Sequence, residues 1–89
     1  DAIDEKKLNF KPDIDLRGMR VDEALYIITN FIDDAVLLGV SRVRILHGTG
    51  TGALRELTRN YLRTVPQVKH VRDEHVQFGG AGITVVDLE

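Results

Sequence analysis

The fold of this chain is decided by residues 43–55, whose sequence is VRILHGTGTGALR. The run Val43–Leu46 is rich in branched apolar residues, which favours a β-strand. Three glycines then alternate with other residues, a pattern typical of a tight loop. Beyond the loop, Leu54, Leu57 and Tyr61 recur at helical spacing. The sequence therefore predicts a strand, a glycine loop and a helix in direct succession.

Before this unit, the sequence predicts a short strand and a long amphipathic helix. Ile14–Leu16 has the pattern of a brief strand, and Gly18 ends it. Apolar residues then follow at three- and four-residue spacing as far as Gly39, which is placed to end the helix. These helical positions are Val21, Ala24, Leu25, Ile28, Phe31, Ile32, Ala35 and Leu38.

After the second helix, two more strands are expected, at Val68–Val71 and Ile83–Leu88. Between them, Gly79–Gly82 predicts a flexible turn. The element order is β-α-β-α-β-β, with the first two strands parallel. This order indicates an α/β fold, a two-layer sandwich in which two helices cover a mixed four-stranded sheet. We expect one domain over residues 13–89 and a linker or N-terminal arm over residues 1–12.

Charge is unevenly distributed along the chain. Residues 1–40 carry nine acidic and five basic side chains, a net charge of −4, and residues 73–89 carry four acidic side chains and no basic one. Residues 41–72 carry seven basic side chains against Glu56 alone, a net charge of +6. These residues predict a basic face suited to phosphate groups; the alternative is that the arginines only solvate a helical surface.

The composition excludes several kinds of site. Without cysteine, the chain forms no disulfide and no cysteine-based zinc site. The same absence fits a reducing compartment, and we expect a cytoplasmic location. The apolar runs are only a few residues long, so no membrane partner is expected. Because the chain begins with Asp1 rather than methionine, we expect it to be a piece of a larger protein.

The glycine loop is suited to bind a phosphate. Gly48, Gly50 and Gly52 let backbone N–H groups approach a ligand closely. Thr49 and Thr51 add hydroxyl groups. The N-terminus of the following helix contributes N–H groups without internal partners and the positive end of the helix dipole. The alternative is a glycine-rich turn that only caps the helix.

Two nucleotide-binding motifs can be compared with this loop. It lacks the Gly-Lys-Ser/Thr ending of a P-loop. Gly48, Gly50 and Ala53 match a loose dinucleotide-binding pattern, and Asp73 follows Ala53 by twenty residues. Only one strand precedes the loop, which leaves little chain for the two halves of a dinucleotide crevice. A dinucleotide enzyme is therefore the weaker alternative.

Three side chains at two neighbouring strand ends are candidates for catalysis. Because parallel strands end at the same edge of a sheet, we expect Asp15 and Arg17 near His47. His47 could transfer a proton near neutral pH, and Arg17 could clamp a phosphate with two hydrogen bonds. Asp15 could orient His47, position water or bind a divalent metal such as magnesium or manganese. The alternatives are a structural Asp15–Arg17 ion pair and a His47 hydrogen-bonded into the turn.

The remaining histidines and the helical aromatic residues indicate structure rather than chemistry. His70 and His75 have no metal-binding spacing, so we expect both at the surface. Tyr26, Phe31 and Tyr61 fall on or near the apolar helix faces. We therefore expect them in the core and not as platforms for stacked bases.

Four motifs in this order resemble the Smr (small MutS-related) domain family. They are Asp15–Arg20, a helix containing Glu23–Leu25, the run His47–Arg55, and Gly79–Gly82 followed by Thr84–Val86. The resemblance covers residues 13–89. It is strongest to the form of the domain that ends a bacterial MutS paralogue which suppresses recombination.

The resemblance implies an α/β domain, similar to the C-terminal domain of a bacterial translation initiation factor, that nicks DNA, branched forms included. Many members have lysine where Thr49 stands, and Arg20 and Arg55 are expected to compensate for the missing charge. The catalytic residues expected are Asp15, Arg17 and His47. The nucleic-acid-binding residues expected are Arg17, Arg20, Gly48, Thr49, Gly50, Thr51, Gly52 and Arg55.

The resemblance also implies a larger protein. The missing part would be an ATPase body, through which the full-length protein forms a dimer. The domain would act in recombination suppression or DNA repair. The alternatives are a non-catalytic module that binds RNA, DNA or a ribosome through the same basic face, and an RNA endonuclease.

Overall fold

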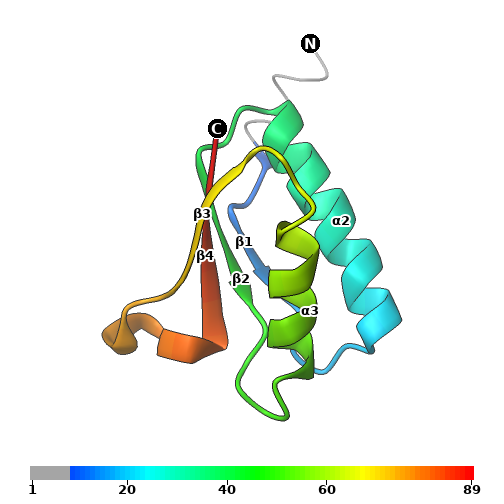
Figure 1. Cartoon of the computed structure of the whole chain (residues 1–89), viewed down its shortest axis with the longest axis vertical. Coiled ribbons are helices and arrows are strands. Elements are labelled where there is room, and N and C mark those ends of the chain that lie inside the picture. The colour runs from blue at the N-terminus through cyan, green and yellow to red at the C-terminus, as the bar shows by residue number, and fades with distance from the viewer. Residues whose placement is uncertain (1–8) are drawn as a thin grey trace.

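The computed structural model describes residues 9–89 and consists of one sheet with two helices on one of its faces (Figure 1). This is the two-layer α/β architecture that the sequence predicts. Two short 3-10 helices lie between the last two strands. In chain order the elements are β1 (Asp13–Asp15), α2 (Val21–Leu37), β2 (Arg42–Leu46), α3 (Ala53–Leu62), β3 (Val68–Asp73), η1 (Val76–Phe78), η2 (Gly80–Gly82) and β4 (Ile83–Leu88).

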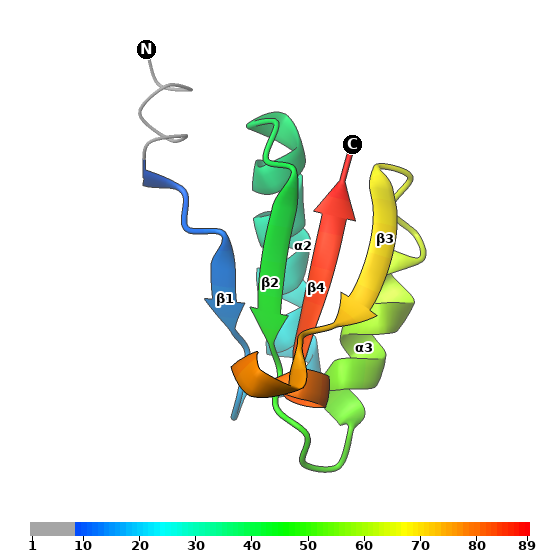
Figure 2. The same cartoon turned by 90° about the vertical axis from the view of Figure 1, so that its left-hand side faces the viewer.

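The four strands lie in the order β1-β2-β4-β3, as Figure 2 shows. β1 pairs parallel with β2, whereas β4 runs antiparallel to both β2 and β3. The sheet is therefore mixed, as predicted, and β1, β2 and β3 point the same way. Their carboxyl ends meet at one edge of the sheet, which we call the carboxyl edge. Open α/β sheets usually bind their ligands at such an edge.

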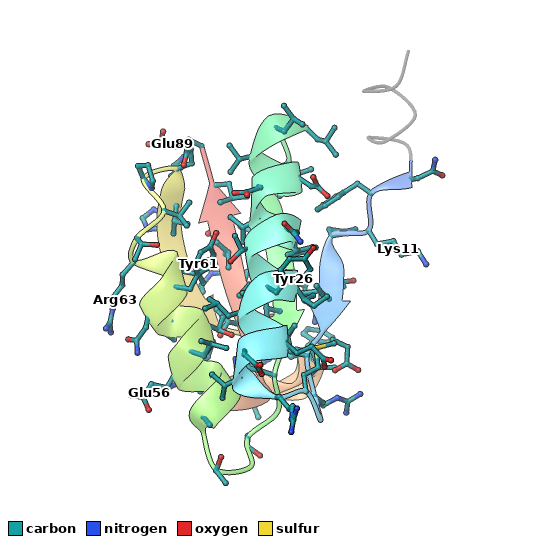
Figure 3. The ribbon with its side chains drawn as sticks, turned by 90° about the vertical axis from the view of Figure 1, so that its right-hand side faces the viewer. Lys11, Tyr26, Glu56, Tyr61, Arg63 and Glu89 are labelled. Carbon is teal, nitrogen blue, oxygen red and sulfur yellow. The ribbon has the colours of Figure 1, made fainter. Side chains whose placement is uncertain are left out.

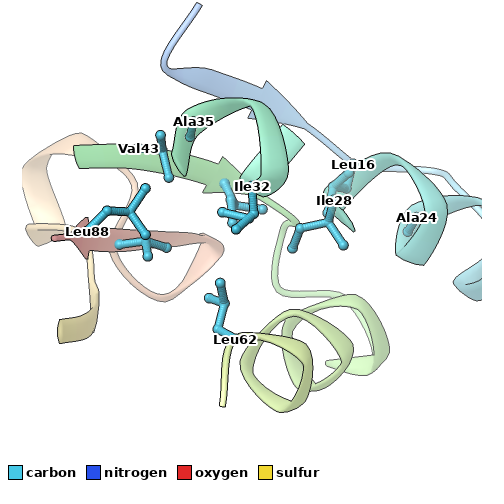
Figure 4. Packing of buried hydrophobic residues seen from close by; sticks show 10 residues of the cluster. Leu16, Ala24, Ile28, Ile32, Ala35, Val43, Leu62 and Leu88 are labelled. Atoms are coloured by element: carbon cyan, nitrogen blue, oxygen red, sulfur yellow. The ribbon is translucent and has the colours of Figure 1, made fainter. Parts of the chain in front are cut away.

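The core fills the space between the sheet and the two helices (Figure 4). Alternate residues of β2 and β4 point toward the helices, because successive side chains of a strand lie on opposite faces. α2 contributes buried residues at four- and three-residue spacing, which marks one face of a helix. The buried residues of this cluster are Leu16, Ala24, Ile28, Ile32, Ala35, Val43, Ile45, Leu62, Val86 and Leu88.

The aromatic side chains of the helices divide between core and surface. Phe31 and Tyr61 are half-buried and pack against the core, as the sequence predicts. Tyr26 is 69 % exposed on α2, so the predicted core position was wrong for this residue (Figure 3). Tyr26 is two residues from both Ala24 and Ile28, which places it on the opposite side of the helix from that buried stripe.

Part of the predicted N-terminal arm packs against the domain. Residues 1–8 lie outside the described residues, so the prediction for them stays a prediction. The ring of Phe10 stacks on that of Phe31, with 5.4 Å between the ring centroids. The carbonyl of Pro12 accepts a hydrogen bond from the N–H of Arg44 at 2.8 Å. Residues 9–12 are therefore anchored to α2 and β2.

The connection between β3 and β4 is hydrogen-bonded, unlike the flexible turn that the sequence predicts. The N–H groups of Phe78 and Gly80 donate to the carbonyl of His75 at 2.8 and 3.1 Å. Gly79 has a φ of +128°, and an added Cβ there would collide with Cδ1 of Ile83. Gly79 therefore fits where a residue with a side chain would strain the backbone.

Two expectations about the surface can be compared with the structure. His70 and His75 are both exposed, as predicted. Within residues 9–89, neither helix is long and apolar enough to cross a membrane.

Candidate functional site

The candidate site is an open groove of about 460 Å³ at the carboxyl edge of the sheet. The residues that follow β1 form one side of it. The loop that joins β2 to α3, at the lower end of Figure 1, forms the other. The groove is lined by Arg17, Gly18, Met19, Val21, His47, Gly48, Thr49, Gly50, Thr51, Gly52, Ala53, Leu54 and Arg55.

The structure brings most of the predicted site residues together. Arg17, His47, the loop Gly48–Gly52 and Arg55 all line the groove. Arg20, which precedes α2, is not one of the lining residues. Of the two arginines expected to supply positive charge at this loop, Arg55 therefore lines the groove and Arg20 does not.

The alternation of glycines in the loop has a conformational reason. Gly48, Gly50 and Gly52 have φ angles of +77°, +22° and +84°. Residues with a Cβ rarely adopt this left-handed region, whereas glycine enters it freely. The side chain of Arg17 also lies against the loop, because a Cβ added at Gly48 would be 3.4 Å from Cγ of Arg17.

Gly82 fixes the start of the loop, a role that the sequence analysis missed. Its carbonyl accepts hydrogen bonds from the N–H groups of His47 and Gly48, at 3.1 and 3.0 Å. An added Cβ at Gly82 would lie 3.6 Å from Cα of Gly48, so the two backbones are in close contact. The N–H of Gly48 is thus engaged, and the N–H groups suited to a ligand are those further along the loop.

The N-terminus of α3 borders the groove. Gly52 precedes the helix, and the hydroxyl of Thr51 accepts a hydrogen bond from the N–H of Ala53 at 3.3 Å. The next N–H groups of a helix have no partner within the helix. Together with the positive end of the helix dipole, they favour a negatively charged ligand at this point.

Asp15 and Arg17 form a two-pronged ion pair beside the groove. Nη2 of Arg17 donates to Oδ2 of Asp15 at 2.9 Å, and Nε donates to Oδ1 at 3.1 Å. The backbone N–H of Arg17 also donates to Oδ1, at 3.0 Å. These hydrogen bonds lower the pKa of Asp15 and raise that of Arg17. The carboxylate of Asp15 therefore orients the guanidinium of Arg17. It accepts hydrogen bonds from Arg17 and does not orient His47, whose ring nitrogens have other partners.

His47 is buried, and both of its ring nitrogens are hydrogen-bonded. Nδ1 lies 2.8 Å from the carbonyl of Gly48, and Nε2 lies 2.7 Å from the hydroxyl of Thr84. Because a carbonyl only accepts, Nδ1 carries the hydrogen, and in the neutral ring Nε2 accepts from Thr84. The arrangement corresponds to the alternative stated above, a histidine hydrogen-bonded into the turn.

The surroundings of His47 favour its neutral form. Burial lowers its pKa most. The carbonyl of Gly48 and the carboxylate of Asp73 act in the opposite direction, and the positive charges of Arg55 and Arg59 lower the pKa further. The net shift is downward from an ordinary value of 6.5, so the ring is neutral at pH 7.

A chain of polar groups connects His47 to β3. The hydroxyl of Thr84, which is fully buried, accepts a hydrogen bond from Nε of Arg59 at 3.1 Å. Arg59 in turn pairs with Asp73, which also binds Nη2 of Arg55 at 2.9 Å. We call Asp73, Arg59, Thr84 and His47 the polar chain. No local pattern in the sequence indicates this chain, because its members belong to four different segments.

The acidic end of the chain folds back on the basic middle segment. Four of the seven basic side chains of residues 41–72 form ion pairs with acidic residues that follow them in sequence. The predicted basic face is therefore weaker than the net charge of that segment indicates. The pairs are Arg42–Asp87, Arg44–Glu74, Arg55–Asp73 and Arg59–Asp73.

Possible metal ligands are scattered in the part of the chain that the structure describes. Within residues 9–89, no group of three or more His, Asp or Glu side chains is placed to hold a metal ion. Both oxygens of Asp15 accept hydrogen bonds from Arg17, so a metal ion bound to Asp15 would lie beside the positive charge of the guanidinium.

The lowered pKa of His47 predicts a pH dependence of stability. As the pH falls through about 6.5, the unfolded chain binds a proton at His47 and the folded chain does not. The free energy of unfolding should therefore decrease by up to about 1.4 kcal/mol per pH unit, until the folded pKa is reached. Urea unfolding between pH 7.5 and 5 measures this, at about half-unit steps. A His47→Gln variant should lack the decrease, and an equal decrease in both proteins would contradict the assignment.

A model of the Smr domain family matches residues 14–89. The chain belongs to the Smr domain family. This Smr domain is 44 % identical to the solved Smr domain of Thermus thermophilus MutS2, with a TM-score of 0.82 over 86 % of this chain and 96 % of that one. It also shares its fold with YdaL, a stand-alone small MutS-related protein from Escherichia coli. That match has 23 % identity and a TM-score of 0.83, over 98 % of this chain and 74 % of YdaL.

Longer relatives named endonuclease MutS2 contain a segment similar to this Smr domain. In Finegoldia magna the identity is 43 % over 90 residues, which is 99 % of this chain and 12 % of the relative. In Halalkalibacterium halodurans it is 47 % over 78 residues, which is 88 % of this chain and 10 % of the relative. The chain thus spans about a tenth of the length of these relatives. The resemblance drawn from the motifs is confirmed.

Proposed function

We propose that this Smr domain is a DNA-nicking endonuclease that binds the phosphodiester backbone in the groove and hydrolyses one strand. One observation carries the proposal: Arg17, whose guanidinium is oriented by Asp15 and whose aliphatic stem lies against Gly48, lines the same groove as the glycine loop and the N-terminus of α3. A fixed guanidinium, loop N–H groups and a positive helix end are the donors that a phosphate requires. The name endonuclease, carried by the longer relatives, supports the same reaction class.

The chemistry needs donors around the phosphate that is attacked. A water oxygen adds to phosphorus, and the bond from phosphorus to one sugar oxygen breaks. Negative charge increases on the phosphate oxygens that remain, and donors already fixed around them lower the barrier. Arg17, the N–H groups of residues 49–52 and the N–H of Leu54 would supply these donors.

Asp15 and His47 enter this proposal with different roles. Asp15 acts through Arg17, which it holds in position. His47 holds the start of the loop through Gly48. To take a proton from the attacking water, Nε2 of His47 would have to exchange the hydroxyl of Thr84 for that water. If magnesium or manganese takes part, phosphate oxygens would have to supply many of its ligands.

The whole protein is part of the same proposal. We propose that the domain belongs to a larger cytoplasmic MutS-type ATPase, dimeric through its ATPase body. There it would act on DNA, branched forms included, in recombination suppression or repair. The lengths of the endonuclease MutS2 relatives support a larger protein.

A binding module without catalysis is the second candidate. The observation that favours it is that Asp15 and His47 are both hydrogen-bonded to other protein groups, so neither is a ready base. Such a module would bind DNA, RNA or a ribosome through the same groove. An RNA endonuclease would use the groove in the same way. RNA differs from DNA by its 2′-hydroxyl, and none of the lining residues is placed to exclude that group.

Cleavage by the purified domain tests the proposal. Supercoiled plasmid is incubated with residues 1–89 in the presence of magnesium, manganese or a chelator, and nicked circles are quantified. We expect nicking by the wild-type domain. RNA of the same sequence is the comparison substrate, and faster cleavage of RNA than of DNA would favour the RNA endonuclease instead. A domain that retains DNA on a gel but leaves the plasmid supercoiled under every condition would support the binding module instead.

A further inference from the structure

The outer side of α3 carries a row of arginines that begins in the site described above and extends beyond it. Arg55, Arg59 and Arg63 follow one another at four-residue spacing, which places them on one side of the helix. They line a second groove of about 490 Å³ together with Thr51, Gly52, Glu56 and Asn60. This groove shares Thr51, Gly52 and Arg55 with the first one, so the two are continuous.

The charge of this row increases toward the C-terminal end of α3. Arg55 and Arg59 share the single carboxylate of Asp73. Arg63 is exposed, and its Nη1 donates to the neutral side chain of Asn60 at 3.0 Å. Figure 3 shows Arg63 and Glu56 projecting from the side of α3 that lies away from α2. Three guanidinium groups thus lie near two carboxylates, those of Asp73 and Glu56. The guanidinium of Arg63, which is bonded to the neutral Asn60, is the most distant from the glycine loop.

The length of the row matches a strand of nucleic acid. Eight residues of α-helix separate Arg55 from Arg63, a rise of about 12 Å. One strand of a duplex carries a phosphate about every 3.4 Å along its axis. The row is therefore long enough to reach more than one phosphate beyond the one bound at the glycine loop.

We propose that this side of α3 is a track for the phosphate backbone of DNA on one side of the nick. Arg55 and Arg63 would bind phosphates, and Arg59, held by Asp73 and Thr84, would add positive charge between them. The contacts reach only the backbone, so the track increases affinity without selecting a sequence. The inference rests on the proposed function, because the groove at the glycine loop sets the position of the strand.

The test measures DNA affinity of the 1–89 domain at several salt concentrations, with a labelled duplex and fluorescence anisotropy. Arg63→Gln removes one phosphate contact, so the slope of log affinity against log salt should become shallower by about 0.9. Arg63→Lys keeps the charge and should restore most of that slope. Arg72→Gln is the matched control, because Arg72 is an exposed arginine that lines neither of the two grooves at α3.

The outcomes separate this inference from the proposed nuclease. A shallower slope for Arg63→Gln and an unchanged slope for Arg72→Gln support the track, even if the wild-type domain leaves plasmid uncut. If Arg63→Gln keeps the wild-type affinity and slope, the track is overturned, and nicking by the wild-type domain would still support the proposed function. Equal losses in the two variants would also overturn it, because they would show that any surface arginine has this effect.

Discussion

Arg17→Gln should lower the nicking rate of the domain by about 10²–10³-fold, the usual cost of removing one fixed donor from a developing negative charge. The structure gives two reasons for a large effect. The guanidinium is already oriented by both oxygens of Asp15, so it loses little freedom when a phosphate binds. Its side chain also lies against Gly48, which places it at the loop. Nicked plasmid per unit time, measured at saturating domain, gives the rate.

Two further variants make this result specific. Asp15→Asn keeps the guanidinium and loses its ion pair, so we expect a smaller loss of rate than for Arg17→Gln. Arg42→Gln breaks another exposed arginine–aspartate pair, with Asp87 at 2.7 Å, at the opposite end of β2 from the groove. It should nick at the wild-type rate. Equal rates for Arg17→Gln and the wild type would remove Arg17 from the proposed site.

Thr84→Val should reduce both stability and nicking. The substitution keeps the shape of the side chain and removes the hydroxyl that joins His47 to Arg59. Nε2 of His47 is then buried without a partner, which costs about 1–3 kcal/mol of unfolding free energy. A shift of the loop by about 1 Å would lower the rate by about 100-fold. Urea unfolding gives the first quantity, and the nicking rate at a temperature where both proteins are fully folded gives the second.

The serine variant separates a positioning role of Thr84 from a general loss of stability. Thr84→Ser restores the hydroxyl and removes a methyl group, so it should lower stability and recover nicking. The loss in the valine variant should appear mainly in the maximal rate, with a smaller change in DNA affinity, because Arg17 and Arg55 remain in place. A valine variant that nicks as fast as the wild type would show that the polar chain does not position the loop.

The local features of the fold could be predicted from the sequence. The run from Val43 to Leu54 contains a strand, a loop and a helix start in one continuous stretch, and each has its own local signal. The parallel pairing of β1 with β2 followed from the helix between them. That pairing brought Arg17 next to Gly48 without any knowledge of side-chain contacts.

The partners of the site residues could not be predicted in the same way. Thr84 lies 37 residues after His47, and no periodicity links the two positions. Gly82 was seen only as part of a turn, although its carbonyl holds the loop. In the sequence, Asp73 fits only the spacing of a loose dinucleotide-binding pattern, whereas in the structure it holds Arg55 and Arg59. Such contacts form where segments that are distant in the sequence pack together. The local pattern of one segment does not predict which residues of another segment it will contact.

The amide spectrum of the isotope-labelled domain, recorded as a short DNA duplex is added, measures where the backbone phosphate binds. We expect the largest shifts at the N–H groups of residues 49–52 and Leu54 and at the Nε–H of Arg17. The N–H groups of Gly48 and Ala53 should change less, because they are bonded to Gly82 and Thr51. If the largest shifts instead fall on β3 and the open face of the sheet, the glycine loop does not bind the phosphate.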